Sequence, residues 1–119
     1  MNSRRGLMAA LVAKLPSKYL VTGPRTVDVL DARRPLVMVI RTNTEPAPNY
    51  SGSYLSTFAI WVIQPKQIAP DDDLDDDLDA VILALDAYDF VAWTGAERST
   101  YLDDYPAYRL TANTIDSKD

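Results

Sequence analysis

Side chains that commonly carry out catalysis or bind metals are scarce in this sequence. Its 119 residues include no cysteine and no histidine, which excludes disulfides, thiolate chemistry and imidazole as a base or metal ligand. The serines therefore lack the histidine partner of a nucleophilic triad, and no Gly-x-Ser-x-Gly turn is present. Neither glycine-rich phosphate-binding motif occurs among the four glycines. We predict a protein that is not an enzyme and has no catalytic residues, cofactor or metal.

The most concentrated chemistry lies in the run DDDLDDDLD at 71–79, which holds seven of the 17 acidic residues. Both registers of the calcium-binding loop fail, because the glycine position is Asp76 or Leu78 and the glutamate position is Ile82 or Ala84. First-turn acids stabilise a helix through its dipole by about 0.3–1 kcal/mol each, whereas aspartates four residues apart repel by about 0.2–0.5 kcal/mol. Since these effects nearly cancel, helix stability does not require so many acids.

Two interpretations of the acidic run stay open: a solvated helix start, or an electrostatic surface with a function. Outside the run, ten acids stand against 12 lysines and arginines. These bases are scattered, so the sequence predicts no positive patch and no specific DNA binding. The candidates for an acidic surface or ring lumen are Asp71, Asp72, Asp73, Asp75, Asp76, Asp77 and Asp79.

The helix expected over 71–88 is apolar on two sides. One stripe, at spacings of four and three residues, comprises Leu74, Leu78, Val81, Leu85 and Tyr88. At 100° per residue, Leu83 lies opposite this stripe and Ala87 lies at the back of the helix. Both sides therefore need a cover, which is either the first helix or a loop of this chain, or another subunit. We predict Leu83 and Ala87 as subunit-interface candidates.

Hydrophobic periodicity and turn residues predict the remaining elements. We expect a helix at 3–15, a short strand at 19–22, a strand or loop at 26–30, a two-sided strand at 36–42, a long loop at 43–53, and strands at 54–64, 90–94 and 105–115, with turns at 94–96 and 103–104. This order predicts an α+β fold in one domain over residues 1–115, followed by a polar tail at 116–119. Its mostly antiparallel or mixed sheet has four to five strands, with two helices packed on one face.

Two further groups of residues are contact candidates. The proline-rich loop and its borders provide Glu45, Tyr50 and Tyr54, which suit an interface if the loop is used for binding. Charges in or beside strands are either surface ion pairs of little energetic value or contacts between subunits. These charges are Arg41, Glu97, Arg98 and Arg109. Near the N-terminus, a short apolar stretch interrupted by Lys14 predicts no signal peptide, and no apolar run is long enough to predict a membrane span.

The order of several stretches resembles the tail terminator (tail completion) proteins of long-tailed, lambda-like bacteriophages, especially those of phages of actinobacteria. The resemblance covers about residues 1–115. It depends on the strand PLVMVIR at 35–41, the loop EPAP at 45–48, the strand FAIWVI at 58–63, the Asp/Leu helix at 71–85 and the closing stretch YLDDYPAY at 101–108. None of these is a catalytic signature; their order and spacing together carry the likeness.

The resemblance implies a structural virion protein that forms a ring, typically a hexamer. Such a ring caps the phage tail tube, ends tube polymerisation and joins the tail to the head. The implied partners are further copies of itself, the tail tube protein and a head-completion or connector protein, and DNA passes through the ring without specific binding. The implied location is the tail neck of the virion, after assembly in the host cytoplasm. The alternatives are another neck or tail-completion protein, or a small dimeric α+β domain that binds ligands or regulates.

Overall fold

A computed structural model describes residues 3–23, 35–46, 52–64, 71–101 and 105–117. Along the chain, the elements are α1 (Ser3–Lys14), β1 (Leu20–Thr22), β2 (Leu36–Pro46), β3 (Ser53–Ile63), α3 (Asp71–Asp86), β4 (Val91–Tyr101) and β5 (Tyr105–Ser117). The five strands form one sheet in the order β1-β2-β3-β5-β4. β1 is parallel to β2 and all other neighbours are antiparallel. The predicted α+β fold with a mixed sheet is therefore confirmed.

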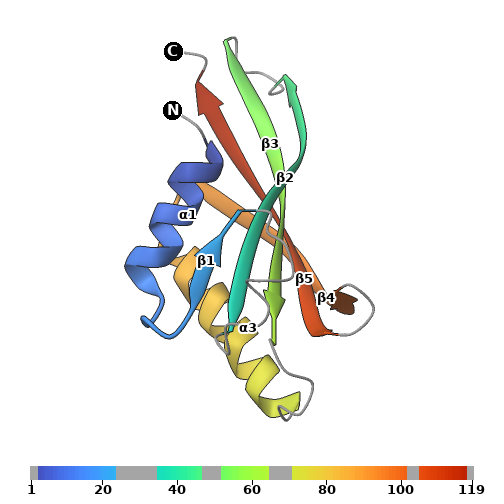
Figure 1. Ribbon diagram of the computed structural model, residues 1–119. Helices are drawn as coiled ribbons and strands as arrows, with labels where there is room; N and C mark the ends of the chain where they lie inside the picture. The colour runs from blue at the N-terminus through green and yellow to red at the C-terminus, as the bar shows by residue number, and fades with distance from the viewer. Residues whose placement is uncertain (1–2, 24–34, 47–51, 65–70, 102–104, 118–119) are drawn as a thin grey trace.

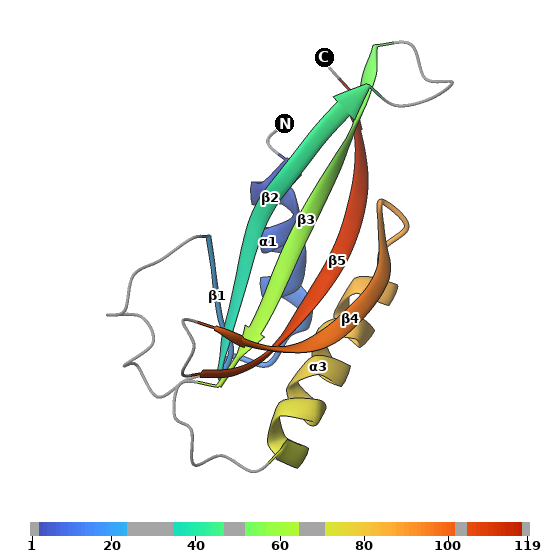
Figure 2. The same cartoon turned by 90° about the vertical axis from the view of Figure 1, so that its right-hand side faces the viewer.

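Both helices lie on one face of the sheet, as Figures 1 and 2 show. α1 ends at Lys14, because Pro16 disfavours helical geometry in the residue before it. Leu7 and Leu11 of α1 and Leu74 and Leu85 of α3 are fully buried against the sheet. Burying one such side chain contributes about 1.5–3 kcal/mol. The strand residues of this core are Val37, Val39, Phe58, Ile60, Val62, Val91, Leu110 and Ala112.

The opposite face of the sheet has a smaller core at one end. Leu36 and Met38 of β2 are fully buried there, which confirms the prediction of a two-sided strand. β4 bends across this face, as Figure 2 shows, and brings Tyr101 onto β2 and β3. The Tyr101 ring packs edge-on against Trp61 at 5.3 Å between centroids, and its hydroxyl donates to the Met38 sulfur at 3.5 Å. The rest of this face stays uncovered by any described helix or strand.

Two threonines in β-bulges explain where strand boundaries differ from the prediction. The register shifts at Thr42 in β2 and at Thr94 in β4. Each hydroxyl donates to a carbonyl of the neighbouring strand, Thr42 to Thr57 at 3.2 Å and Thr94 to Thr111 at 3.4 Å. The predicted turn at 94–96 is therefore wrong: a bulge lets β4 continue to Tyr101.

The β2–β3 hairpin is longer than predicted. The expected loop at 43–53 was too long, because β2 continues to Pro46 and pairs with β3 from Tyr54 onward. Gly52 precedes β3 with a φ of 79°, a conformation that favours glycine. The hairpin projects beyond the helices in Figure 1, which contributes to a long molecule of 49 × 25 × 22 Å. The expectations at 26–30 and 103–104 lie outside the described residues.

Candidate functional site

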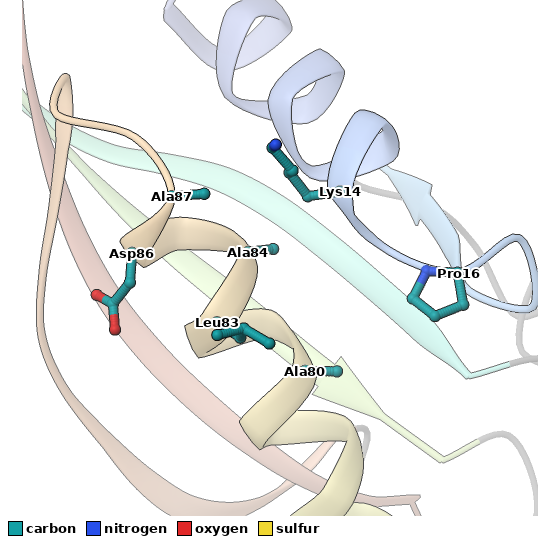
Figure 3. A pocket seen from close by; sticks show the side chains of 7 residues that line it. All are labelled: Lys14, Pro16, Ala80, Leu83, Ala84, Asp86 and Ala87. Atoms are coloured by element: carbon teal, nitrogen blue, oxygen red, sulfur yellow. The ribbon is translucent and has the colours of Figure 1, made fainter.

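A shallow apolar groove of about 520 Å³ lies between the end of α1 and the second half of α3. We call it the α3 groove; its lining residues are Lys14, Pro16, Ala80, Leu83, Ala84, Asp86 and Ala87. In Figure 3 the alanines point from α3 toward Lys14 and Pro16, while Asp86 points the other way. Small side chains on one wall and a proline on the other therefore leave room for an apolar side chain from outside.

Leu83 is the most exposed large hydrophobic residue of the described chain, with 75% of its surface accessible. Ala87 is exposed as well. The idea that the first helix or a loop of the same chain covers this side of α3 is therefore wrong for Leu83 among the described residues. α1 packs instead on the neighbouring side of α3, where the Tyr88 hydroxyl donates to the Ala10 carbonyl at 3.1 Å. The subunit-interface hypothesis for Leu83 and Ala87 stays a prediction.

The apolar surface continues from the α3 groove around the end of α1. A second depression of about 370 Å³ shares Pro16 and extends to Val12, Leu20 and Val21. Val12 is 62% exposed. The two depressions thus form one continuous apolar surface around Pro16. A continuous surface of this kind is more informative than single exposed hydrophobic residues, which are common on soluble proteins.

A second apolar patch lies on the uncovered face of the sheet and reaches the sheet edge at Phe90, whose ring packs edge-on against Tyr88 at 5.5 Å. Core residues such as Ala112 point toward the helices, so the alternating Asn113 and Ile115 point the other way. Leu55 is the cross-strand partner of Ile115, and Phe90 lies beside them. We call this surface the β5 patch; its residues are Leu55, Asp89, Phe90, Ala92, Asn113 and Ile115. Ile115 is 50% and Phe90 is 45% exposed.

The β5 patch was missed from the sequence, although a signal for it exists. In β5 the apolar residues 110 and 112 alternate with polar ones until Ile115 breaks the pattern. An isoleucine on the polar side of this half-buried strand was therefore the sequence signal for apolar surface on that face.

Asp77 corrects the prediction that the whole acidic run lies on the surface. It is only 3% exposed. The Tyr19 hydroxyl donates to its Oδ1 at 2.6 Å, and the Gln64 amide donates to its Oδ2. Burial raises the pKa of Asp77 above its usual value, against the lowering effect of the Tyr19 hydrogen bond. Burial and the Asp77 carboxylate also raise the pKa of Tyr19, which keeps this hydroxyl a donor.

The other described side chains of the run are exposed: those of Asp73, Asp75, Asp76 and Asp79. Asp75 accepts a hydrogen bond from the Tyr108 hydroxyl at 2.6 Å, and this bond raises the pKa of Tyr108. Within the described part of the chain, no three acidic side chains converge on a metal-sized site. Asp71 and Asp72 begin α3, but their side chains lie outside the description.

Two of the four strand charges, Glu97 and Arg109, come together across β4 and β5, whereas Arg98 lies on the opposite face of the sheet. Glu97 lies directly opposite Arg109 in the β-ladder. The Arg98 guanidinium lies over the Tyr108 ring at 5.6 Å. Arg41 is exposed on β2, on the other side of β3 from these residues.

The loop candidates flank the end of the β2–β3 hairpin. Glu45 is exposed and pairs with Leu55, and the half-buried Tyr54 pairs with Pro46. Tyr50 lies outside the described residues. Apart from the buried Asp77, the described candidates of the sequence therefore lie in four regions: the outer face of α3, the β4–β5 charges, Arg41 on β2 and the hairpin end.

No protein-family model and no curated protein matches the sequence. A crystal structure of a protein from Akkermansia muciniphila is similar, with a TM-score of 0.45 and 10% identity, over 99% of this chain and 76% of that one. No helix in the described residues is long and apolar enough to cross a membrane.

Proposed function

We propose that this protein is a non-catalytic ring subunit of a phage tail, with the role of a tail terminator. In this role it binds copies of itself, caps the tail tube and offers a surface to the head connector. The observation that carries the proposal is the exposed Leu83 in the α3 groove. Its outward position in a well-packed helix is explained if assembly, rather than folding, buries it.

The distribution of apolar surface supports a ring over a closed dimer. The α3 groove lies on the helix layer, whereas the β5 patch lies on the uncovered face of the sheet. A two-fold dimer uses one patch twice, but a ring needs two different patches that fit head to tail. One subunit with two unlike patches meets this requirement, although the patches adjoin where the Phe90 ring packs edge-on against Tyr88 at 5.5 Å.

The exposed aspartates support a surface that faces DNA without gripping it. Asp73, Asp75, Asp76 and Asp79 project from the first half of α3. Repetition of these charges around a ring would concentrate negative potential, which repels phosphates. The proposed ring therefore allows DNA passage without specific binding.

A tube-capping experiment tests the proposal. The tail tube protein encoded in the same genome is polymerised with and without this protein, and tube lengths are measured by electron microscopy. We expect the protein to bind tube ends and to shorten the length distribution. Leu83→Asp is expected to fold but to lose this effect, and Thr100→Asp is the exposed control that retains it. Tube lengths that do not respond to the wild-type protein would contradict the proposal.

A further inference from the structure

We propose that the α3 groove of one copy receives the β5 patch of the next copy, so that Leu83 packs against Ile115 of the neighbour. This inference deepens the proposed function and depends on it. The occupant of the groove is a second copy of this chain, which binds through its β5 patch. The α3 groove of that second copy stays free to receive the β5 patch of a third copy.

The two surfaces complement each other in shape and polarity. The α3 groove is lined by three alanines and Pro16, so a larger apolar side chain fits between its walls. The β5 patch offers Phe90 and Ile115, each with about half of its surface exposed. Packing these side chains into the groove would remove apolar surface from water on both partners, at about 25 cal/mol for each Å².

Charge complementarity favours the same pairing. Lys14 lies at the rim of the α3 groove, where its ammonium is 5.9 Å from the centre of the Tyr88 ring. The exposed Asp89 lies at the rim of the β5 patch. Docking the patch in the groove therefore brings Lys14 of one copy near Asp89 of the next. This pair of opposite charges attracts the two copies and favours one relative orientation.

Charge also disfavours the simplest alternative, in which two copies of α3 pair with each other. α3 contains eight aspartates and no lysine or arginine. A parallel pair would place the two acidic runs side by side, and an antiparallel pair would place each run near Asp86 of the partner. Both arrangements oppose like charges without compensation from the helix itself, whereas the β5 patch brings a single acid, Asp89, which can lie beside Lys14.

The absence of cysteine allows a direct test by thiol crosslinking. The double variant Leu83→Cys/Ile115→Cys is treated with a short bis-maleimide and analysed on a denaturing gel. Head-to-tail contacts predict a ladder of covalent multimers that ends at the size of the ring. The matched control is Thr100→Cys/Ile115→Cys, which keeps one thiol and moves the other to an exposed site on β4, and it is expected to remain monomeric.

Single variants separate the two kinds of symmetry. Leu83→Cys alone and Ile115→Cys alone should give no crosslink, while the two single variants refolded together should give covalent dimers and nothing larger. Dimers from Leu83→Cys alone would show that α3 pairs with α3 and would overturn the inference.

Native mass spectrometry of the wild-type protein distinguishes failure of this inference from failure of the proposed function. If rings form but the double variant gives no ladder, the surface assignment is wrong and the ring subunit stands. If no ring forms under any condition that preserves the fold, the proposed function is wrong and this inference fails with it.

Discussion

The two halves of α3 invert the usual relation between polarity and burial. In the acidic first half, Asp77 is buried and holds two hydrogen bonds. In the apolar second half, Leu83 is three-quarters exposed. The two residues differ in what surrounds them: Tyr19 and Gln64 meet Asp77, while no described part of the chain covers Leu83.

The difference separates folding from assembly. Asp77 joins α3 to Tyr19 before β1 and to Gln64 after β3, so it fixes the helix on the sheet within one subunit. Leu83 contributes little to that packing and is free to contribute to contact with another copy. A substitution at Asp77 should therefore lower the stability of the subunit, whereas a substitution at Leu83 should disrupt self-association and leave the stability nearly unchanged.

The largest effect on stability is expected for Asp77→Ala. The substitution leaves the Tyr19 hydroxyl and the Gln64 amide without their buried acceptor, which should lower the free energy of unfolding by about 2–4 kcal/mol. Urea unfolding measures the change. The control is Asp76→Ala, an exposed neighbour expected to change stability by at most about 0.5 kcal/mol. Equal losses in the two variants would show that the buried hydrogen bonds do not hold α3 in place.

Leu83→Asp should produce the reverse result. Because Leu83 is exposed, the unfolding free energy of the subunit should change by at most about 0.5 kcal/mol. A charge in the α3 groove should nevertheless abolish self-association, since its desolvation opposes contact. Light scattering after size exclusion measures the mass, and circular dichroism monitors the fold. A variant that retains the wild-type mass would show that Leu83 is simply exposed.

The pH dependence of stability should depend on Asp77. Its pKa is higher in the folded protein than the ordinary 3.8, so the native state binds more protons between these two pKa values. The stabilisation by this proton is complete below the ordinary pKa and is lost as pH rises through the folded pKa. The unfolding free energy should accordingly fall as the pH rises from 3.8 through the folded pKa of Asp77.

Asp77→Asn provides the control for this titration, because it removes the ionisable group and keeps a polar side chain. Its unfolding free energy should depend less on pH than that of the wild type, whereas Asp76→Asn should leave the dependence largely unchanged. A wild-type slope equal to that of Asp77→Asn would rule out Asp77 as its source.

The smallest effect is expected from the exposed aspartates. The assembled wild-type protein should not retain duplex DNA even at low salt, where electrostatic attraction is strongest. Replacing Asp73, Asp76 and Asp79 with Asn should preserve the fold and allow weak retention, measured by filter binding. If the replacement changes neither retention nor assembly, the acidic surface does not face DNA.

The sequence predicted correctly those helices and strands that show a hydrophobic pattern within their own residues. The apolar run at 36–40 and the stripe from Leu74 to Tyr88 define a two-sided strand and a helix face, and both are found. The polar residues of β2 from Asn43 to Pro46 were assigned to a loop because only cross-strand pairing with β3 makes them a strand. The bulge at Thr94 was likewise mistaken for a turn, since Gly95 suits both.

The buried acid was missed although the helical pattern contained it. At 100° per residue from Leu74, Asp77 falls at about 300°, beside Tyr88 at about 320°, at the edge of the buried stripe. Its partners Tyr19 and Gln64 are 58 and 13 residues away, so no local pattern reveals that its burial is compensated. For Leu83, the sequence left two possible covers open: another element of the same chain, or another subunit. The helical pattern alone does not distinguish them, because it shows only that this side of the helix is apolar.

The mass of the wild-type protein by native mass spectrometry tests the central claim most directly. We predict a closed ring, with six times the chain mass of 13.2 kDa as the expected value, and a single chain mass for Leu83→Asp. A wild-type protein that stays at 13.2 kDa over a wide range of concentration, or that forms only a dimer, would contradict the claim that this is a ring subunit.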